Sequence, residues 1–141
     1  MIYSKANQNQ IDDVFSVFSN AIVNMEKQNI HQWDDIYPDK AIILSEEYDK
    51  EYKNGKWQWP NARFCVIHRL CVSPDFQNRG IAAETLKYIE NLCKSQGYDS
   101  IRLDCFTEKP YSRKLYDKAG YSVVGYADWR KGIFELREKK I

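Results

Sequence analysis

The sequence lacks several features that would assign it to a specialised class of protein. It has no apolar run approaching the roughly 20 residues that a membrane-spanning helix needs. Its six glycines and four prolines exclude a collagen-like or low-complexity chain. Its N-terminus has no basic region leading into an apolar segment, so we expect neither a signal peptide nor a membrane partner. With 141 residues, of which 43% are hydrophobic, residues 1–141 are expected to form one soluble, cytoplasmic domain.

Signals for nucleic-acid or metal binding are also missing. Lys and Arg number 21 against 20 Asp and Glu, so there is no overall basic field and no nucleic-acid partner is expected. No two of the four cysteines form a C-x-x-C pair, and each lies in an apolar run. This pattern predicts buried thiols that pack as small hydrophobes, with no metal site, disulfide or nucleophile. The cysteines are Cys65, Cys71, Cys93 and Cys105.

Apolar periodicity predicts an α/β fold. Steps of three and four between Ile11 and Met25 indicate an amphipathic helix, and residues 64–72 read as a strand that is apolar on both faces. The strand-helix-strand unit over 64–106 is expected to be a right-handed parallel crossover in a mixed sheet. Further helices are predicted over 30–37, 80–96 and 110–120, and further strands over 2–6, 41–45, 101–105, 121–127 and 132–138.

The turn between the strand over 64–72 and its helix resembles an anion site. A helix N-terminus exposes unsatisfied N–H groups and the positive end of the helix dipole. Gly80 would let an anion approach the backbone, Ala82 would keep that approach open, and Arg79 could add a charged contact. A glycine at such a turn can equally be there only for its backbone angles.

Two motifs carry a resemblance to a known family. Residues 67–82 read IHRLCVSPDFQNRGIA, an apolar strand followed by Val-x-Pro, an aromatic residue and a Gly-containing turn. Residues 114–121 read KLYDKAGY. In this order and spacing they resemble the acetyl-CoA motif and the later L-Y-x-K-x-G-F/Y segment of the GCN5-related N-acetyltransferase (GNAT) superfamily. The resemblance covers residues 62–127.

The resemblance implies a cofactor site and a sheet with helices on both faces. The strands over 64–72 and 100–106 would splay apart around pantetheine, whose amides would pair with nearby backbone groups. N–H groups of residues 78–82 would hold the pyrophosphate. The family usually has a β-hairpin before the central strand, and this chain is too short there for all of it. The implied cofactor-binding residues are Leu70, Cys71, Val72, Gln77, Asn78, Arg79, Gly80, Ile81, Ala82 and, where the family often has Asn, Lys109.

Two residues are candidates for the proton transfers of acetyl transfer. The resemblance makes Tyr116 the acid for the leaving thiolate, and an ordinary phenol could do this at a cost of about 2 kcal/mol. The alternative is that its ring only packs. His68 is a candidate base, because imidazole titrates near neutral pH, or else a core histidine bonded to a backbone carbonyl. Aromatic residues could line the acceptor site or simply pack half-buried; they are Trp33, Trp57, Trp59 and the neighbouring Tyr52.

The sequence therefore predicts an acetyl-CoA-dependent N-acetyltransferase. A primary amine, carried by a small molecule or a peptide, would attack the thioester directly, with no metal cofactor. The alternative is a degenerate acyl-CoA-binding module without transferase activity. We also expect a homodimer, because a sheet that lacks a strand exposes unpaired backbone groups, together with apolar surface of the strand over 41–45 and of the N-terminal helix. In a monomer, the polar connection over 46–60 would have to cover this gap. The terminal strand, with Ile133, Phe134 and Leu136, is the other candidate contact.

Overall fold

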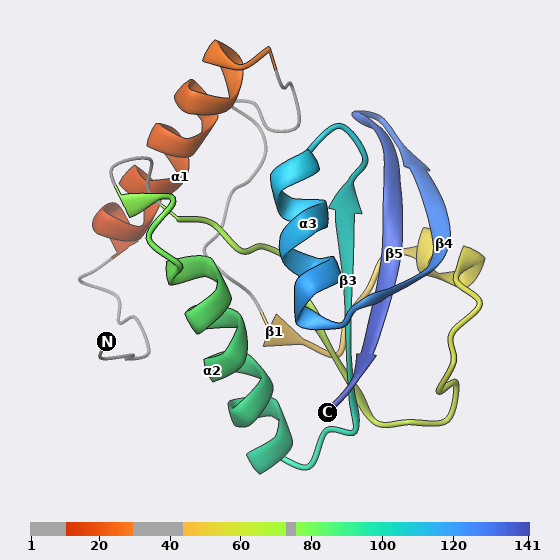
Figure 1. Ribbon diagram of the computed structural model, residues 1–141. Coiled ribbons are helices and arrows are strands. Elements are labelled where there is room, and N and C mark those ends of the chain that lie inside the picture. The colour runs from red at the N-terminus through yellow and green to blue at the C-terminus, as the bar shows by residue number, and fades with distance from the viewer. Residues whose placement is uncertain (1–10, 30–43, 73–75) are drawn as a thin grey trace.

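The computed structural model of the protein describes residues 11–29, 44–72 and 76–141 (Figure 1). The strand predicted over 2–6, the helix predicted over 30–37 and residues 41–43 lie outside this part of the chain. The elements within it are α1 (Ile11–Lys27), β1 (Leu44–Ser45), the 3₁₀ helix η2 (Lys50–Asn54), β2 (Phe64–Ile67), α2 (Ile81–Ser95), β3 (Ser100–Phe106), α3 (Pro110–Ala119), β4 (Ser122–Trp129) and β5 (Gly132–Lys140).

The three α-helices follow the periodicity and the stop signals of the sequence. Leu86, Ile89 and Cys93, on the apolar stripe of α2, are buried. Proline occupies the start of α3, where its missing N–H costs no hydrogen bond, and Gly120 follows the end of the helix. The predictions of these helices are confirmed. No helix in the described part of the chain combines the length and apolar character needed to cross a membrane.

The strands form a mixed sheet in the order β1-β2-β3-β5-β4. β2 and β3 are parallel, joined through α2, and the other neighbouring pairs are antiparallel. The predicted α/β class and parallel crossover are therefore confirmed. In Figure 1, α2 and α3 lie beside the sheet, and α1 lies near the N-terminal end of α2.

The two faces of the sheet have different covers. On one face α2 and α3 bury a core that includes Ile67, Leu103 and Leu86. On the other face Tyr52, which belongs to η2, packs in a second core with Val66, Val124, Ala127 and Leu136. Helical elements thus cover both faces, although the second cover is a single 3₁₀ turn within residues 46–63.

Segment 46–63 connects β1 to β2, in the region where the chain is too short for the whole hairpin of the family. It contains no strand; it is a coil around η2, and its backbone packs directly on β4. Lys56 N–H donates to the Val124 carbonyl at 2.7 Å. A Cβ on Gly125 would lie 2.7 Å from the Asn54 carbonyl oxygen, so only glycine allows this approach. Of the aromatic residues that could line the acceptor site, Tyr52 is buried and stacks on Trp57, and Trp57 and Trp59 are half-buried. Trp33 lies outside the described residues.

A buried ion pair fastens this segment to the sheet. Arg102 Nε donates to Glu138 Oε1 at 3.0 Å, and these side chains are 6% and 0% exposed. Glu138 Oε2 accepts the N–H groups of Gln58 at 2.7 Å and Trp59 at 3.3 Å. The Arg102 guanidinium lies 4.2 Å from the centre of the Trp57 ring. The carboxylate therefore binds two strands and the covering segment at one point.

Part of the surface named in the dimer prediction is covered. Segment 46–63 packs on one face of the sheet, against β4. Two of the three candidate contacts on the last strand are core residues: Phe134 is 7% exposed and Leu136 0%, whereas Ile133 is 52% exposed. Among the described residues, β1 at the end of the sheet pairs with β2 alone. The homodimer stays a prediction, which light scattering tests: a mass of 16.7 kDa would contradict it.

Replacing Glu138 tests the anchoring of the segment. Glu138→Gln keeps the size of the side chain but leaves the Arg102 charge buried without its partner. Removing one member of a buried pair costs about 3–5 kcal/mol, so denaturant unfolding should show a loss of that size. Glu46→Gln, which breaks the exposed pair with Arg63, is the matched control and should cost far less. Equal losses would show that Glu138 is not an anchor.

Candidate active site

The pairing of β2 with β3 ends halfway along β3. Their paired residues run from Phe64↔Ser100 to Ile67↔Leu103, whereas β3 continues to Phe106 with β5 as its partner. The predicted strand over 64–72 is therefore too long. Residues 68–72 leave the ladder because β3 no longer lies beside them. The two strands therefore diverge beyond Ile67 and Leu103, as the resemblance implies.

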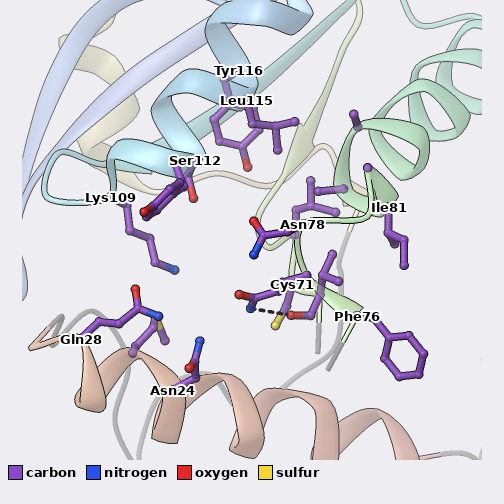
Figure 2. A pocket seen from close by; sticks show the side chains of 18 residues that line it. Asn24, Gln28, Cys71, Phe76, Asn78, Ile81, Lys109, Ser112, Leu115 and Tyr116 are labelled. Atoms are coloured by element: carbon purple, nitrogen blue, oxygen red, sulfur yellow. Dashed lines mark hydrogen bonds between the residues drawn. The ribbon is translucent and has the colours of Figure 1, made fainter. Parts of the chain in front are cut away.

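A cavity of about 480 Å³ opens beside this divergence (Figure 2). Its walls are residues 70–72, the loop before α2, the start of α2, and α3, and the end of α1 closes one side. Nine of the ten predicted cofactor-binding residues line it. They are Leu70, Cys71, Val72, Gln77, Asn78, Gly80, Ile81, Ala82 and Lys109.

Arg79 is the predicted residue that does not line the cavity. It is exposed, and its guanidinium lies 5.4 Å from the centre of the Phe76 ring. In this arrangement its charge faces solvent beside the loop. A contact from Arg79 to a ligand in the cavity would need another side-chain conformation.

The loop before α2 has the backbone of an anion site. Asn78 and Gly80 both have left-handed backbone angles, with φ of 60° and 77°. Gly80 is the N-cap of α2 and has no side chain to satisfy the first N–H groups of the helix. Backbone turns of this kind can make N–H groups converge on one anion. The Gln77 side chain donates to the Val72 carbonyl at 3.0 Å, so its observed contact closes the loop itself.

Polar groups face this loop from the opposite walls. The Lys109 ammonium points into the cavity (Figure 2). Burial lowers the pKa of Lys109, although the thiols of Cys71 and Cys105 act in the opposite direction. Asn24, on α1, and Gln28, just after its end, add two amides. The sequence analysis does not identify these two as site residues. Their only signal is a polar position on an amphipathic helix.

Tyr116 combines packing with a place in the cavity wall. The residue is 7% exposed, its ring contacts that of Tyr121 edge-on at 5.8 Å, and its hydroxyl points toward the cavity in Figure 2. Burial raises the pKa of Tyr116, with smaller contributions from Cys105 and Asp104. The hydroxyl is therefore firmly protonated, and a weaker acid than the ordinary phenol assumed from the sequence.

An ion cluster holds the helix that carries Tyr116. Arg137, on β5, is 1% exposed and donates to Glu135 at 2.6 Å and to Asp117, on α3, at 2.7 Å. Arg113, also on α3, lies 2.8 Å from Glu135. Because Arg113 and Asp117 are one helical turn apart, the cluster fixes the position of α3 on the sheet.

His68 lies at a second, smaller cavity of about 40 Å³ between the diverging strands. Tyr116 lines both cavities. His68 Nε2 lies 3.0 Å from the Glu47 carbonyl oxygen and 3.0 Å from Ser45 Oγ. A carbonyl oxygen only accepts, so Nε2 carries a proton, and Nδ1 is the ring nitrogen that could accept one. The carbonyl-bonded alternative is thus present, and Nδ1 could still act as a base.

Asp104 is a residue of this cavity that the sequence analysis misses. It follows the last residue of β3 that is paired with β2. It is half-buried, and its Oδ2 accepts a hydrogen bond from the Tyr52 hydroxyl at 2.9 Å. Burial raises the pKa of Asp104 from 3.8 to about 6. An acidic residue near the C-terminal end of a mostly apolar parallel strand is the signal that could have identified it.

The thiols that line the two cavities, those of Cys71 and Cys105, show no sign of activation as nucleophiles. Cys65, Cys93 and Cys105 are buried, Cys71 is half-buried, and all four are free. Burial raises the pKa of Cys71 to about 11 and that of Cys105 to about 12. Both therefore stay protonated near neutral pH. Among the described residues, no group of three or more His, Cys, Asp or Glu could hold a metal ion.

Comparisons with known proteins agree on the fold. The family model described as "Acetyltransferase (GNAT) family" matches residues 25–121. A GNAT-family acetyltransferase structure from Streptococcus agalactiae has a TM-score of 0.80 at 20% identity and covers 98% of this chain and 94% of its own. One from Listeria monocytogenes has a TM-score of 0.72 at 16% identity, with coverage of 96% and 92%. No curated protein sequence gives a significant match.

The raised pKa of Asp104 predicts a pH-dependent stability. Between about pH 4 and pH 6 the folded state binds more protons than the unfolded chain, so the parent loses stability as the pH rises. Asp104→Asn removes this effect. Its free energy of unfolding relative to the parent should therefore rise by about 2 kcal/mol from pH 4 to pH 7. Denaturant titrations at the two pH values measure it, and a constant difference would contradict the raised pKa.

Proposed function

Because the chain belongs to the acetyltransferase (GNAT) family, we propose that it binds acetyl-CoA in the larger cavity and transfers the acetyl group to a primary amine. The match to residues 25–121 confirms the resemblance identified from the two motifs. The observation that carries the proposal is the divergence of β2 and β3 beside a cavity that joins the loop before α2 to Tyr116. An extended, phosphate-bearing thioester suits such a site.

The residues of the cavity suit the parts of acetyl-CoA. The N–H groups of residues 78–82 would bind the pyrophosphate at the start of α2. The backbone of residues 70–72, which is not paired with β3, would accept the pantetheine amides in the manner of an added strand. Lys109, across the cavity, offers a cation to the pantetheine or to a phosphate. These assignments rest on backbone more than on side chains.

Tyr116 is the residue that would protonate the departing thiolate. The amine nitrogen attacks the thioester carbonyl carbon, the carbon–sulfur bond breaks, and the sulfur takes the phenolic proton. With the pKa of Tyr116 raised by burial, this transfer costs more than the about 2 kcal/mol of an ordinary phenol. A buried site also strengthens the electrostatic interactions that can offset part of that cost.

A second candidate is a module that binds acyl-CoA without turnover. It is favoured by the acceptor side of the fold, where segment 46–63 contains no strand. An amine panel that follows free CoA separates the two functions. Acetyl-CoA binding without CoA release for any amine would favour the module, whereas acetylated product would establish the transferase. Light scattering in the presence of acetyl-CoA would also test whether the proposed homodimer forms with its ligand.

The phosphate assignment predicts an effect of substitution at Gly80. In Gly80→Glu a carboxylate stands beside the proposed pyrophosphate site, where a Cβ would project into open space, and CoA affinity should fall by at least tenfold in calorimetry. The φ of 77° makes any side chain there strained. Gly97→Glu, at φ 80° and outside the cavity, is therefore the matched control. Equal CoA affinity in both variants would remove the assignment.

The acid role predicts a loss of turnover without a loss of binding. Tyr116→Phe keeps the ring and removes the proton donor, so acetyl-CoA affinity should hold while kcat falls about 10²–10⁴-fold. Tyr121→Phe, in the neighbouring ring outside the cavity, should retain parental kcat. A Tyr116→Phe variant within threefold of the parent would leave Tyr116 with a packing role alone.

A further inference from the structure

A carboxylate lies at the strand divergence on the sheet face opposite α2 and α3. The last β2–β3 pair is Ile67↔Leu103, and Asp104 is the next residue along β3. Side chains alternate along a strand, so Leu103 and Cys105 pack toward the helices while Asp104 points to the face that segment 46–63 covers. The smaller cavity between the strands is lined by Asp104 and by Tyr116. The gap in the sheet thus has a carboxylic acid from one face and a phenol from the other.

Tyr52 orients this carboxylate. Tyr52 is 2% exposed, and its hydroxyl donates to Asp104 Oδ2 at 2.9 Å. Its own position is fixed by Trp57, whose ring stacks on it at 5.6 Å and whose Nε1 donates to the Tyr52 carbonyl at 2.9 Å. A carboxylate has more acceptor sites than one hydroxyl can use, so Asp104 can still accept a proton donor from the cavity.

The charged groups around Asp104 come from several elements. Asp49, before η2, raises the pKa of Asp104, whereas Tyr52 and Arg69 lower it; burial is the largest influence and leaves it at about 6. His68, Lys109 and Tyr116 face the same cavity. Asp104 is thus a carboxylate at neutral pH, and it accepts a proton more readily than an exposed aspartate does. Its negative charge also contributes to keeping Tyr116 protonated.

We propose that Asp104 binds the acceptor amine as its ammonium ion and takes the first proton from it, and that Tyr52 is the positioning residue for this step. The proposal rests on the proposed acetyl transfer and deepens it. The acceptor class is a cationic primary amine whose nitrogen enters the smaller cavity from the face that segment 46–63 covers. This segment thereby supplies the acceptor side of the site.

The protons balance over the reaction. The ammonium gives one proton to Asp104, which returns it to solvent. The neutral nitrogen forms a bond to the thioester carbon, and the carbon–sulfur bond breaks. The sulfur takes the proton of Tyr116, and the phenolate recovers the second proton that nitrogen loses as it becomes an amide. One proton is released per turnover, and the other remains on the CoA thiol.

His68 is the competing base, and its geometry differs. Its Nε2 is held by the Glu47 carbonyl and Ser45 Oγ, so only Nδ1 could receive a proton. The two assignments predict different variants to lose the acidic limb of the pH profile. Comparing Asp104→Asn with His68→Gln therefore separates them.

The experiment measures kcat/KM for a cationic amine that the parent acetylates, from pH 5 to pH 8. The parent should rise through about pH 6 as Asp104 ionises. Asp104→Asn should lose this rise and fall about 10²–10⁴-fold at pH 7.5, while Asp104→Glu recovers part of the activity and the rise. Tyr52→Phe should fall about tenfold, with KM for the amine raised and acetyl-CoA affinity unchanged in calorimetry.

Matched controls remove the same groups elsewhere. Asp128→Asn and Tyr126→Phe change exposed residues of β4 and should leave the profile unchanged. Thermal melts check that each variant is folded. The proposal is overturned if folded Asp104→Asn stays within threefold of the parent, or if His68→Gln loses the rise while Asp104→Asn keeps it. A parent that binds acetyl-CoA but acetylates no amine would instead overturn the proposed function, and this inference with it.

Discussion

The buried ion pair of Glu138 and Arg102 holds together parts of the molecule that are far apart in the sequence. One carboxylate receives a guanidinium from β3 and two backbone N–H groups from residues 58 and 59. A buried carboxylate of this kind is costly unless its oxygens are satisfied, and here the partners come from both the sheet and its cover. The position of Tyr52, and through it that of Asp104, follows from this attachment.

β5, the strand that carries Glu138, has a second ionic cluster on its opposite face. Glu135 and Arg137 point toward α3, whereas Leu136 and Glu138 point toward segment 46–63. β5 therefore fixes the cover of each face by charge as well as by apolar burial. The two groups that meet at the strand divergence, Asp104 and Tyr116, are both positioned through β5. This explains how a short chain can hold a site between two faces of one sheet.

The sequence predicts those parts of the fold that depend on residues close together in the chain. Apolar stripes give the helices, Pro110 and Gly120 bound α3, and the turn around Gly80 gives the likeness to a phosphate loop. Nine of ten cofactor-binding candidates do share one cavity, because they lie on two neighbouring stretches of chain and one helix start. Arg79 departs because its long side chain can turn to solvent and stack on Phe76.

The parts that sequence does not predict depend on contacts between distant residues. Segment 46–63 has aromatic residues at irregular spacing among charged ones, so no period indicates that it is a cover. Its docking depends on Gly125 and Glu138, which lie about 70 to 80 residues later. Asp104 becomes a site residue only because the pairing of β3 with β2 ends at Leu103, the residue before it.

The uneven burial of the four thiols has a practical consequence. Cys65, Cys93 and Cys105 are enclosed by the core, whereas Cys71 is half-buried and forms part of the wall of the larger cavity. A small alkylating reagent that reaches the folded chain would therefore meet one sulfur first. A molecule that fills the cavity would block the alkylation of Cys71. The rate of Cys71 alkylation, followed by mass spectrometry, therefore measures how much of the cavity is occupied, whatever the occupant.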